Sequence, residues 1–584
     1  EATQTMGTTA LSRTEVMTEV GADEAPLSPS HAGLSPRPSE IMLTPRQANE
    51  SDSPSSRFMF IDRDKGTGSV ESAESEGSAT SEGSHFRGTK RRKHATRLLV
   101  THTMGLQPSS ALQLIIESSE DIRAHYEFDP KILGEGAFGK VRKGKIKATG
   151  AVRAVKAIEK AKMSTQQHVV KQEIEIMKML DHPNLLMLFE VMEDPKELFL
   201  VLELCGGGSL KDHIKKSPIK ENTAAIVMQQ VLRATHYLHI RNIVHRDLKA
   251  DNALLDKAGP LAQAVVKVAD FGLSCKLDPG KMLTRPAGTP THMAPEVFAR
   301  RYTQQCDTWS CGIITYTMIA GHEPFLATTK PDLINKISKG PVDFSSPQWL
   351  SASQHAVEFT KKLLTKSAKS RMVPRDALHD VWIKSNEPKV PKAKLPWKVI
   401  NDLRKFRSRN RFKQAALHVI ASMLPEEDIK DHRKAFIQLD SDGDGYFTVE
   451  ELKEALRRML FAPASITEHN EEDDRPIHEK LSSAFSYTEF LAATFDMAKA
   501  LRMNLCQAAF ASFDKNKDGS ISISELATGK MLGQLTMDEV METMEALDVD
   551  GNCELDYPEF LKMMRGSSYE SVVIEGEVEP ETKD

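Results

Sequence analysis

The sequence has little cysteine, no long apolar run and little net charge. Its 584 residues include six cysteines, and no two of them stand in C-x-x-C spacing. The sequence therefore predicts neither a disulfide framework nor a zinc site, and it favours a reducing, cytoplasmic location. No apolar run approaches the roughly 18 residues that span a bilayer, and no secretory signal is recognisable. The net charge of −5 argues against a dedicated nucleic-acid binder.

The first 122 residues are poor in apolar side chains and rich in Ser, Glu, Thr, Pro and Gly. Such a segment cannot offset the entropy lost on ordering its chain, so residues 1–122 are predicted to be disordered. The basic run at 90–93 is compatible with a nuclear signal, with contact to an acidic membrane surface, or with a solvated charge run. Membrane association through this extension has no further support in the sequence.

The segment HRDLKADN, residues 245–252, carries the first strong functional pattern. It places Asp247 two residues before Lys249 and five residues before Asn252. This spacing resembles the catalytic loop of protein kinases, in which the Asp accepts the proton of the substrate hydroxyl and the Asn binds Mg²⁺. The DFG segment that follows supplies Asp270, which corresponds to the second Mg²⁺ ligand of that family.

A glycine-rich segment, LGEGAFGKV, lies upstream at residues 133–141. Its G-x-G-x-x-G spacing alone could open a dinucleotide-binding unit, but the residues after it have the pattern of a second strand and not of a helix. A P-loop is excluded because Val141 stands where a magnesium-binding hydroxyl is needed. We therefore predict a hairpin that covers phosphates. The expected nucleotide-binding residues are Leu133, Gly134, Glu135, Gly136, Ala137, Phe138, Gly139, Lys140, Val141, Lys156, Glu203 and Cys205.

Two charged residues between these motifs are predicted to form an ion pair. Lys156 lies in the apolar strand pattern RAVKAI, and Glu173 lies in KQEIEIMKML, which has the apolar periodicity of an amphipathic helix. In protein kinases a Lys–Glu pair of this kind orients the phosphates of the nucleotide. Further along the chain, Arg371 resembles the usual partner of the Glu in the APE segment, here Glu296.

Residues 126–383 thus resemble a protein kinase along their full length. The resemblance implies an α+β fold with two lobes, a small, mostly antiparallel lobe and a larger helical one. Lys249 in the catalytic loop and the GTP segment at 288–290 are similar to the Ser/Thr branch of the family. The catalytic residues implied are Asp247, Lys249, Asn252, Asp270, Lys156 and Glu173.

A basic, amphipathic segment follows a Pro- and Lys-rich hinge. From Trp397 onward, apolar residues recur every third position, at Ile400, Leu403 and Phe406, among many Arg and Lys side chains. This pattern is typical of a calmodulin-binding helix, and a membrane-surface helix is the alternative. The sequence that follows favours the first interpretation.

Residues from 425 onward contain calcium-loop patterns. An EF-hand loop needs oxygen ligands at positions 1, 3 and 5, Gly at 6, a carbonyl at 7 and Glu at 12. Two loops fit throughout. The last loop has Cys553 at the sixth position, where a side chain costs strain of about 1 kcal/mol. We expect this last loop to bind calcium more weakly. The predicted ligands are Asp440, Asp442, Asp444, Tyr446 and Glu451; Asp514, Asn516, Asp518, Ser520 and Glu525; and Asp548, Asp550, Asn552, Glu554 and Glu559.

The interval between the first two loops leaves room for one more hand. A loop starting at His478 would place Phe485 and Glu489 at its eighth and twelfth positions. However, His478, Lys480 and Ser482 occupy the positions where carboxylates belong. We predict a hand that is formed but binds no calcium.

The order of these parts resembles the calcium-dependent protein kinases of plants and apicomplexan protists. The resemblance implies ATP, Mg²⁺ and Ca²⁺ as cofactors, protein Ser/Thr substrates, and a monomer in which the junction helix obstructs the substrate cleft until calcium binds. A calcium sensor or scaffold with an inert kinase domain is the alternative. The expected parts are a disordered extension (1–122), a kinase domain (126–383), a junction (384–424), an all-α calmodulin-like region with four hands (425–565) and an acidic tail (566–584).

Overall fold

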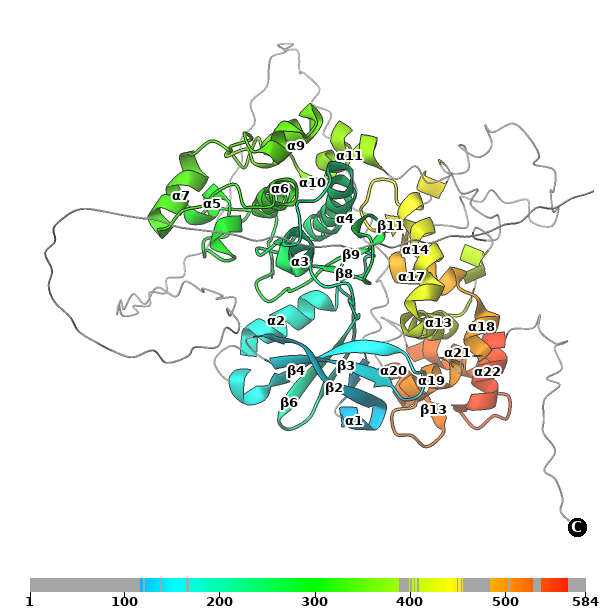
Figure 1. Cartoon of the computed structure of the whole chain (residues 1–584). Helices are drawn as coiled ribbons and strands as arrows, with labels where there is room; N and C mark the ends of the chain where they lie inside the picture. The colour runs from blue at the N-terminus through cyan, green and yellow to red at the C-terminus, as the bar shows by residue number, and fades with distance from the viewer. Residues whose placement is uncertain are drawn as a thin grey trace, which may run out of the picture. The chain divides into compact units, whose positions relative to one another are not determined.

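A computed structural model gives the fold of the chain (Figure 1). It describes residues 116–118, 121–136, 139–163, 167–387, 399, 402–403, 405–406, 409–448, 450–452, 454, 484–502, 505–528 and 537–565. All of these residues belong to one compact unit, 57–584. None of the helices in these ranges is both long enough and apolar enough to cross a membrane.

The small lobe is built on a six-stranded sheet in the order β1-β5-β6-β4-β3-β2. Neighbouring strands are antiparallel except β1 and β5, which are parallel. Helix α2 (Gln167–Met177) lies beside the sheet in Figure 1 and buries its apolar side, including Val170 and Ile174. A short helix, α1 (Ile122–His125), precedes β2, and a single 3-10 turn, η1 (Lys160–Met163), follows β4. The strands are β1 (Ile116–Ser118), β2 (Tyr126–Gly136), β3 (Gly139–Ile146), β4 (Val152–Glu159), β5 (Leu188–Glu193) and β6 (Glu197–Leu202).

Strand β1 corrects the predicted extent of disorder. It lies inside the 1–122 segment, yet it pairs with β5 in the register Ile116 to Glu190. The sequence around it, LQLIIES, is far more apolar than the rest of the extension, which accounts for an added edge strand. Residues 1–115, where most of the predicted disorder falls, lie outside the described ranges.

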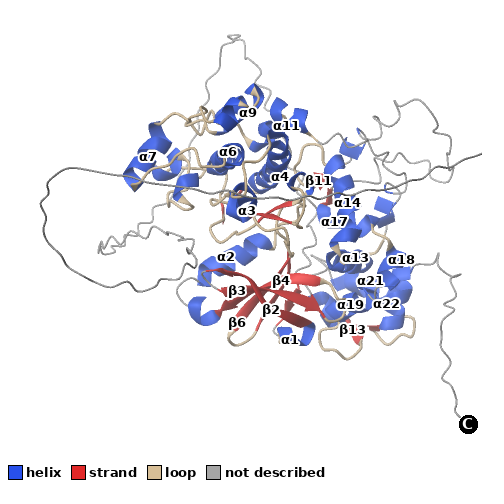
Figure 2. Ribbon diagram, in the orientation of Figure 1, coloured by secondary structure: helices blue, strands red, loops and turns tan. Residues whose placement is uncertain are grey.

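The large lobe is mainly helical, as Figure 2 shows. Its centre is formed by α4 (Glu221–Ile240) and α6 (Gln305–Ala320), which contact each other. Helix α6 ends at Gly321, whose φ of +82° is a conformation that glycine adopts without strain. The other helices are α3 (Leu210–Ile214), α5 (Pro295–Phe298), α7 (Lys330–Lys339), α8 (Pro347–Leu350), α9 (Gln354–Leu363), α10 (Pro374–Leu378) and α11 (Val381–Asn386).

Short antiparallel pairs and 3-10 turns carry the catalytic segments between these helices. Strand β8 pairs with β9, and β7 pairs with β10. The segment that ends at Asn252, the predicted metal-binding Asn, forms the 3-10 turn η2. The ranges are β7 (Ile243–Val244), η2 (Ala250–Asn252), β8 (Ala253–Leu255), η3 (Leu261–Gln263), β9 (Val266–Val268), β10 (Cys275–Lys276) and η4 (Pro290–His292).

The C-terminal region packs around a helix that is buried on all sides, α13 (Arg411–Met423). Every residue from Ala415 to Ala421 is buried, and the surrounding core is shared with the other helices of this region. The two pairs β11–β12 and β13–β14 join neighbouring loops. The remaining elements are α14 (Glu426–Leu439), β11 (Tyr446–Phe447), β12 (Phe485–Ser486), α17 (Tyr487–Thr494), α18 (Met497–Arg502), α19 (Leu505–Phe513), β13 (Ser520–Ser522), α20 (Ile523–Thr528), α21 (Met537–Leu547), β14 (Glu554–Asp556) and α22 (Tyr557–Arg565).

The junction is not one uninterrupted helix. Asn410 has extended backbone angles, and its side-chain oxygen accepts a hydrogen bond from the Lys413 N–H at 2.7 Å, so it caps the start of α13. Leu403 and Phe406, from the predicted amphipathic segment, are buried in the same core as α13. Trp397 and Ile400 lie outside the described residues.

Candidate functional site

The carboxylate of Asp247 is held by hydrogen bonds from two directions. One oxygen, Oδ1, accepts bonds from the N–H of Thr289 at 2.8 Å and from its hydroxyl at 2.7 Å. The other, Oδ2, accepts a bond from Lys249 Nζ at 2.9 Å. Lys249 Nζ also lies 2.9 Å from the hydroxyl of Thr289. Asp247 and Lys249, both predicted catalytic residues, therefore share one network, which fixes the orientation of the Asp247 carboxylate.

Asn252 is positioned by the same loop. Its side-chain nitrogen donates to the backbone oxygen of Asp247 at 2.8 Å, so its side-chain oxygen is the atom that can face a cation. Asp270 has a left-handed backbone with φ of +68°, which turns the chain just after the buried strand β9. An amide oxygen and a carboxylate are ligands that suit Mg²⁺, so these two residues fit that ion.

The ion pair expected between strand and helix is present. Lys156 Nζ of β4 lies 2.9 Å from Glu173 Oε1 of α2. Glu173 is only 4% exposed, so its carboxylate depends on this partner in a poorly solvated place. The pair thereby links helix α2 to the sheet and holds the Lys156 side chain in the orientation expected for binding the nucleotide phosphates.

The glycine-rich segment is a hairpin, as predicted. Strand β2 ends at Gly136 and β3 begins at Gly139, and these two residues are paired across the turn. The structure shows why residue 139 must be glycine, independently of any phosphate. A Cβ at this position would lie 1.7 Å from the backbone oxygen of Ala157, so the glycine allows β3 to pass close to β4. Ala137 and Phe138 lie outside the described residues.

The residues predicted around the adenine differ in what they can offer. The side chain of Glu203 is engaged with Lys267 at 2.7 Å, so only its backbone is available to a nucleotide. Cys205 is partly buried beside the core, as is Val141. Burial, followed by repulsion from Glu203, raises the pKa of the Cys205 thiol far above its usual value. The thiol therefore stays protonated and unreactive.

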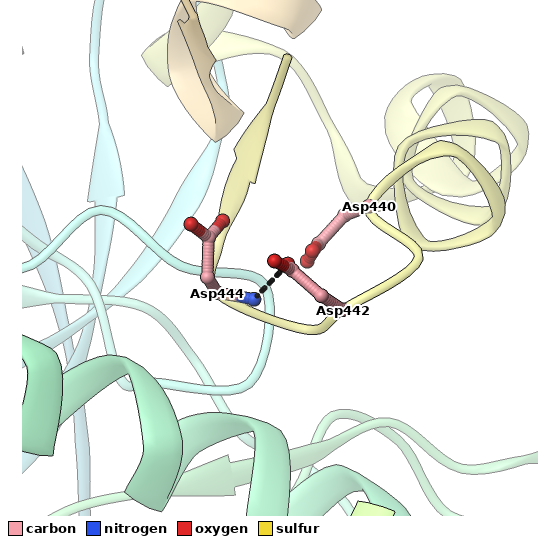
Figure 3. Close-up of side chains that lie close together, drawn as sticks. All are labelled: Asp440, Asp442 and Asp444. Atoms are coloured by element: carbon pink, nitrogen blue, oxygen red, sulfur yellow. Dashed lines mark hydrogen bonds between the residues drawn. The ribbon is translucent and has the colours of Figure 1, made fainter. Parts of the chain in front are cut away.

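The first calcium loop gathers three carboxylates. Side-chain oxygens of Asp440, Asp442 and Asp444 lie within 4.8 Å of one another. Figure 3 shows the carboxylates of Asp440 and Asp442 pointing toward each other, with the N–H of Asp444 donating to Asp442. Glu451, the twelfth residue, accepts bonds from the N–H groups of Ser441 and Thr448. The loop therefore already has a closed form.

The electrostatics of this loop favour a bound cation. Burial, together with repulsion among the carboxylates, raises the pKa of Asp440 to about 8, although Arg233 opposes this rise. Burial and the charge of Asp442 raise the pKa of Asp444 to about 7. Asp440 Oδ1 is buried and, within the described part of the chain, accepts no hydrogen bond. Closely spaced carboxylates and an unused oxygen fit Ca²⁺, which binds six to eight oxygen ligands.

The two later loops share the backbone of the first. In each loop the N–H of the sixth residue donates to the first carboxylate, at 3.2 Å from Gly445, 3.1 Å from Gly519 and 2.7 Å from Cys553. Cys553 has φ of +62°, the strained conformation predicted for a side chain at this position. Oxygens of Asp548, Asp550 and Glu559 also lie within 4.8 Å of one another.

In the third loop (514–525) two carboxylate pKa values are lowered and not raised as in the first loop. Burial acts to raise the pKa of Glu525, but hydrogen bonds from Ser522, Asn516 and Lys515 outweigh it and lower the pKa. Hydrogen bonds from Ser520 and Asn516 likewise lower the pKa of Asp518. These carboxylates are already charged at neutral pH without a cation.

The second hand is formed where the structure describes it. Phe485 pairs with Phe447 of the first loop, and Glu489 forms a capping box with Ser486 at the start of α17. His478, Lys480 and Ser482, the residues predicted to prevent calcium binding, lie outside the described ranges.

Several kinase residues contact the hands, and no pattern in the sequence indicated these contacts. The carboxylate of Asp181 accepts bonds from the N–H of Thr488 at 3.1 Å and from its hydroxyl at 2.7 Å. Arg153 of β4 donates to the backbone oxygen of Ser422 at the end of α13. Met187 packs against the apolar core of the hands. Thr289 was also missed as a site residue, although its place in the GTP segment was a usable signal.

Protein-family models match three parts of the chain. A protein kinase domain matches residues 127–383, an EF-hand domain matches 431–461, and an EF-hand domain pair matches 502–565. The second hand falls in the interval between the two EF-hand matches.

Named relatives match most of the chain. Calcium-dependent protein kinase 7 of Oryza sativa subsp. japonica is 34% identical over 473 residues, covering 80% of this chain and 85% of that protein. Calcium-dependent protein kinase 5 of Plasmodium falciparum is 34% identical, covering 78% and 80%. Calcium-dependent protein kinase 21 of Arabidopsis thaliana is 35% identical, covering 77% and 84%.

The raised pKa values predict a pH-dependent first loop. Below about pH 7, Asp440 and Asp444 hold protons that calcium must displace, so the calcium affinity of this loop should rise with pH from 6 to 8. Each displaced proton changes the affinity about tenfold per pH unit. Titration calorimetry on the Glu525→Gln/Glu559→Gln variant, which leaves the first loop intact, should show this rise.

The matched control is Glu451→Gln/Glu559→Gln, which leaves the third loop. Because the pKa of Glu525 is lowered, calcium binding to this variant should be nearly constant over the same pH range. Equal pH dependence in both variants would contradict the assignment of raised pKa values to the first loop.

Proposed function

The chain belongs to the calcium-dependent protein kinase family, and from this premise we propose that it is a calcium-activated Ser/Thr protein kinase. It transfers the γ-phosphoryl group of ATP to hydroxyl groups of protein substrates. The observation that carries the proposal is that one chain contains both a formed kinase ion pair and a closed calcium loop. Lys156 and Glu173 are paired at 2.9 Å, and the loop of Asp440, Asp442 and Asp444 is closed.

The chemistry assigns a task to each network. Mg²⁺, when bound with ATP, would supply charge neutralisation at the phosphates. Asp247 accepts the proton of the substrate hydroxyl, and its orientation is set by Thr289 and Lys249. Lys156, held by Glu173, orients the phosphates from the side of the sheet. Asn252 and Asp270 would hold the metal ion.

Regulation is proposed to act through the junction. Helix α13 is buried on every face among the helices of the hands, so it cannot lie in the substrate cleft at the same time. We propose that the junction obstructs the cleft in the calcium-free protein and is withdrawn when the hands enclose it. The contacts of Asp181 and Arg153 with the hands then stabilise the enclosed form against the kinase domain.

The alternative is a calcium sensor with an inert kinase domain. It is disfavoured because Asp247, Lys249, Asn252 and the Lys156–Glu173 pair are all present and mutually positioned. A scaffold would have no need to retain this geometry.

The main test compares peptide phosphorylation with calcium and with chelator. We expect calcium to raise kcat at least about tenfold, equivalent to 1.4 kcal/mol of coupling. Asp247→Asn should abolish turnover in both conditions because the base is lost. Glu525→Gln should blunt the response to calcium while leaving the ATP site intact. Equal rates with calcium and chelator would exclude calcium regulation, and no turnover in either would favour the scaffold.

Thr289 gives a second test, as a residue that positions the base. Thr289→Val removes the hydroxyl that bonds to Asp247 and should lower kcat roughly 10- to 100-fold, because misplacing a catalytic group costs rates of this order. The KM for ATP should change less than kcat, since the hydroxyl of Thr289 bonds to Asp247 and Lys249, both of the catalytic loop. Thr289→Ser, which keeps the hydroxyl, should recover most of the rate. A Val variant as active as the parent would show that Asp247 needs no such support.

A third test concerns the contact between kinase and hands. Asp181→Ala removes the carboxylate that bonds to Thr488 and should lower the calcium-stimulated rate severalfold, because a lost hydrogen bond to a charged group costs about 1.5–3 kcal/mol. Asp278→Ala is the control, since Asp278 is exposed and pairs only locally with Lys281. The two variants should differ clearly in activity at saturating calcium. If both match the parent, this contact does not stabilise the active form.

A further inference from the structure

The first calcium loop lies directly against helix α4 of the kinase domain. A Cβ added at Gly445 would lie 2.4 Å from the ring of Tyr237 and 2.8 Å from the ring of His182. The loop backbone therefore touches these rings with no room for a side chain. The hydroxyl of Tyr446, the seventh loop residue, accepts a hydrogen bond from Arg241, the residue that follows the last turn of α4.

Within this contact Arg233 reaches a calcium ligand. Arg233 is only 8% exposed, and it lies in the middle of α4 between apolar neighbours. Its Nη1 atom donates to the backbone oxygen of Asp440 at 3.0 Å and lies 3.4 Å from Asp440 Oδ2. The other oxygen, Asp440 Oδ1, is the buried acceptor left without a partner among the described residues.

The Asp440 carboxylate can thus contact two cations, the guanidinium of Arg233 and a calcium ion. Arg233 contacts the carboxylate through Oδ2, while Oδ1 remains for a calcium ion. We propose that Arg233 is a built-in counter-charge for the first calcium loop, which anchors the loop on α4 and lowers its affinity for calcium. This proposal rests on the proposed function only in requiring that the first loop binds calcium.

The sign follows from the charges. A guanidinium and Ca²⁺ on one carboxylate repel each other, so the arginine weakens calcium binding. The ion does not expel the arginine, because four carboxylates, those of Asp440, Asp442, Asp444 and Glu451, carry more negative charge than one Ca²⁺ neutralises. The bond from Arg233 to the backbone oxygen of Asp440 also uses no calcium ligand.

The opposite effect, in which Arg233 preorganises the loop and raises its affinity, is weaker on physical grounds. The loop closes through its own bonds, from Gly445 N–H to Asp440 and from Ser441 N–H to Glu451. Equivalent bonds close the third loop, where Gly519 and Lys515 donate. The loop backbone is therefore ordered without Arg233. The positive charge of Arg233 is what distinguishes the first loop from the third.

The test measures calcium binding to the full chain by titration calorimetry. The background is Glu525→Gln/Glu559→Gln, so that the heat reports the first loop. In this background Arg233→Gln should bind calcium about tenfold more tightly, because the competing charge is gone. Arg233→Lys, which keeps the charge, should stay within about twofold of the parent. Arg241→Gln, which removes a nearby charge that bonds a hydroxyl and not a carboxylate, should change affinity less than about threefold.

Each result decides the proposal. Unchanged or weaker binding in Arg233→Gln overturns it, and so does equal tightening in Arg241→Gln. A thermal melt with chelator shows whether Arg233→Gln is folded, and if it is not, a change of more than about twofold in the calcium affinity of Arg233→Lys overturns the proposal. Lack of calcium binding in the parent background also overturns it, whereas calcium stimulation of the unaltered kinase is measured separately and decides the proposed function.

Discussion

Helix α13 needs a partner on every side, and this requirement organises the C-terminal half of the chain. Its buried residues run without interruption from Ala415 to Ala421. A helix that buries successive residues on every face, with His418 as the one polar side chain in this run, is stable in water only inside a core. The hands supply that core through α17 and α19, and the kinase adds Met187. Arg153 completes the enclosure by placing a cation at the C-terminal end of the helix, where the helix dipole favours positive charge.

Three loops with one backbone differ in their electrostatic surroundings. The bond from the sixth N–H to the first carboxylate is common to all of them, even where Cys553 replaces glycine. Yet burial raises the pKa of Asp440, while bonds within the third loop lower that of Glu525. The difference arises because α4 covers the first loop. Ligand spacing therefore predicts where calcium binds, and under the proposal made for Arg233 the packing of the kinase domain affects how strongly.

The sequence predicted what depends on local pattern. The hairpin at Gly136 and Gly139 follows from short-range spacing, and the pairing of Lys156 with Glu173 follows from the resemblance to protein kinases. The contacts from Arg233 to Asp440 and from Asp181 to Thr488 join residues 207 and 307 positions apart, and no local rule links them. The break at Asn410 was within reach, because Asn is a preferred N-cap residue.

The distribution of contacts along α13 suggests a division of work between the two pairs of hands. Phe412, at its first turn, packs against Phe513 and Phe560 of the last two hands. Its far end meets the kinase through Ser422, and the first two hands are bonded to α4 and Asp181. Moving a switch from 1:99 to 99:1 needs about 5.5 kcal/mol of differential binding, or about 1.8 kcal/mol from each of three sites. If Arg233 lowers the affinity of the first loop as proposed, its share is smaller and the later loops must contribute more. The later hands also hold the basic start of α13, where Lys413 donates to the backbone oxygen of Met563.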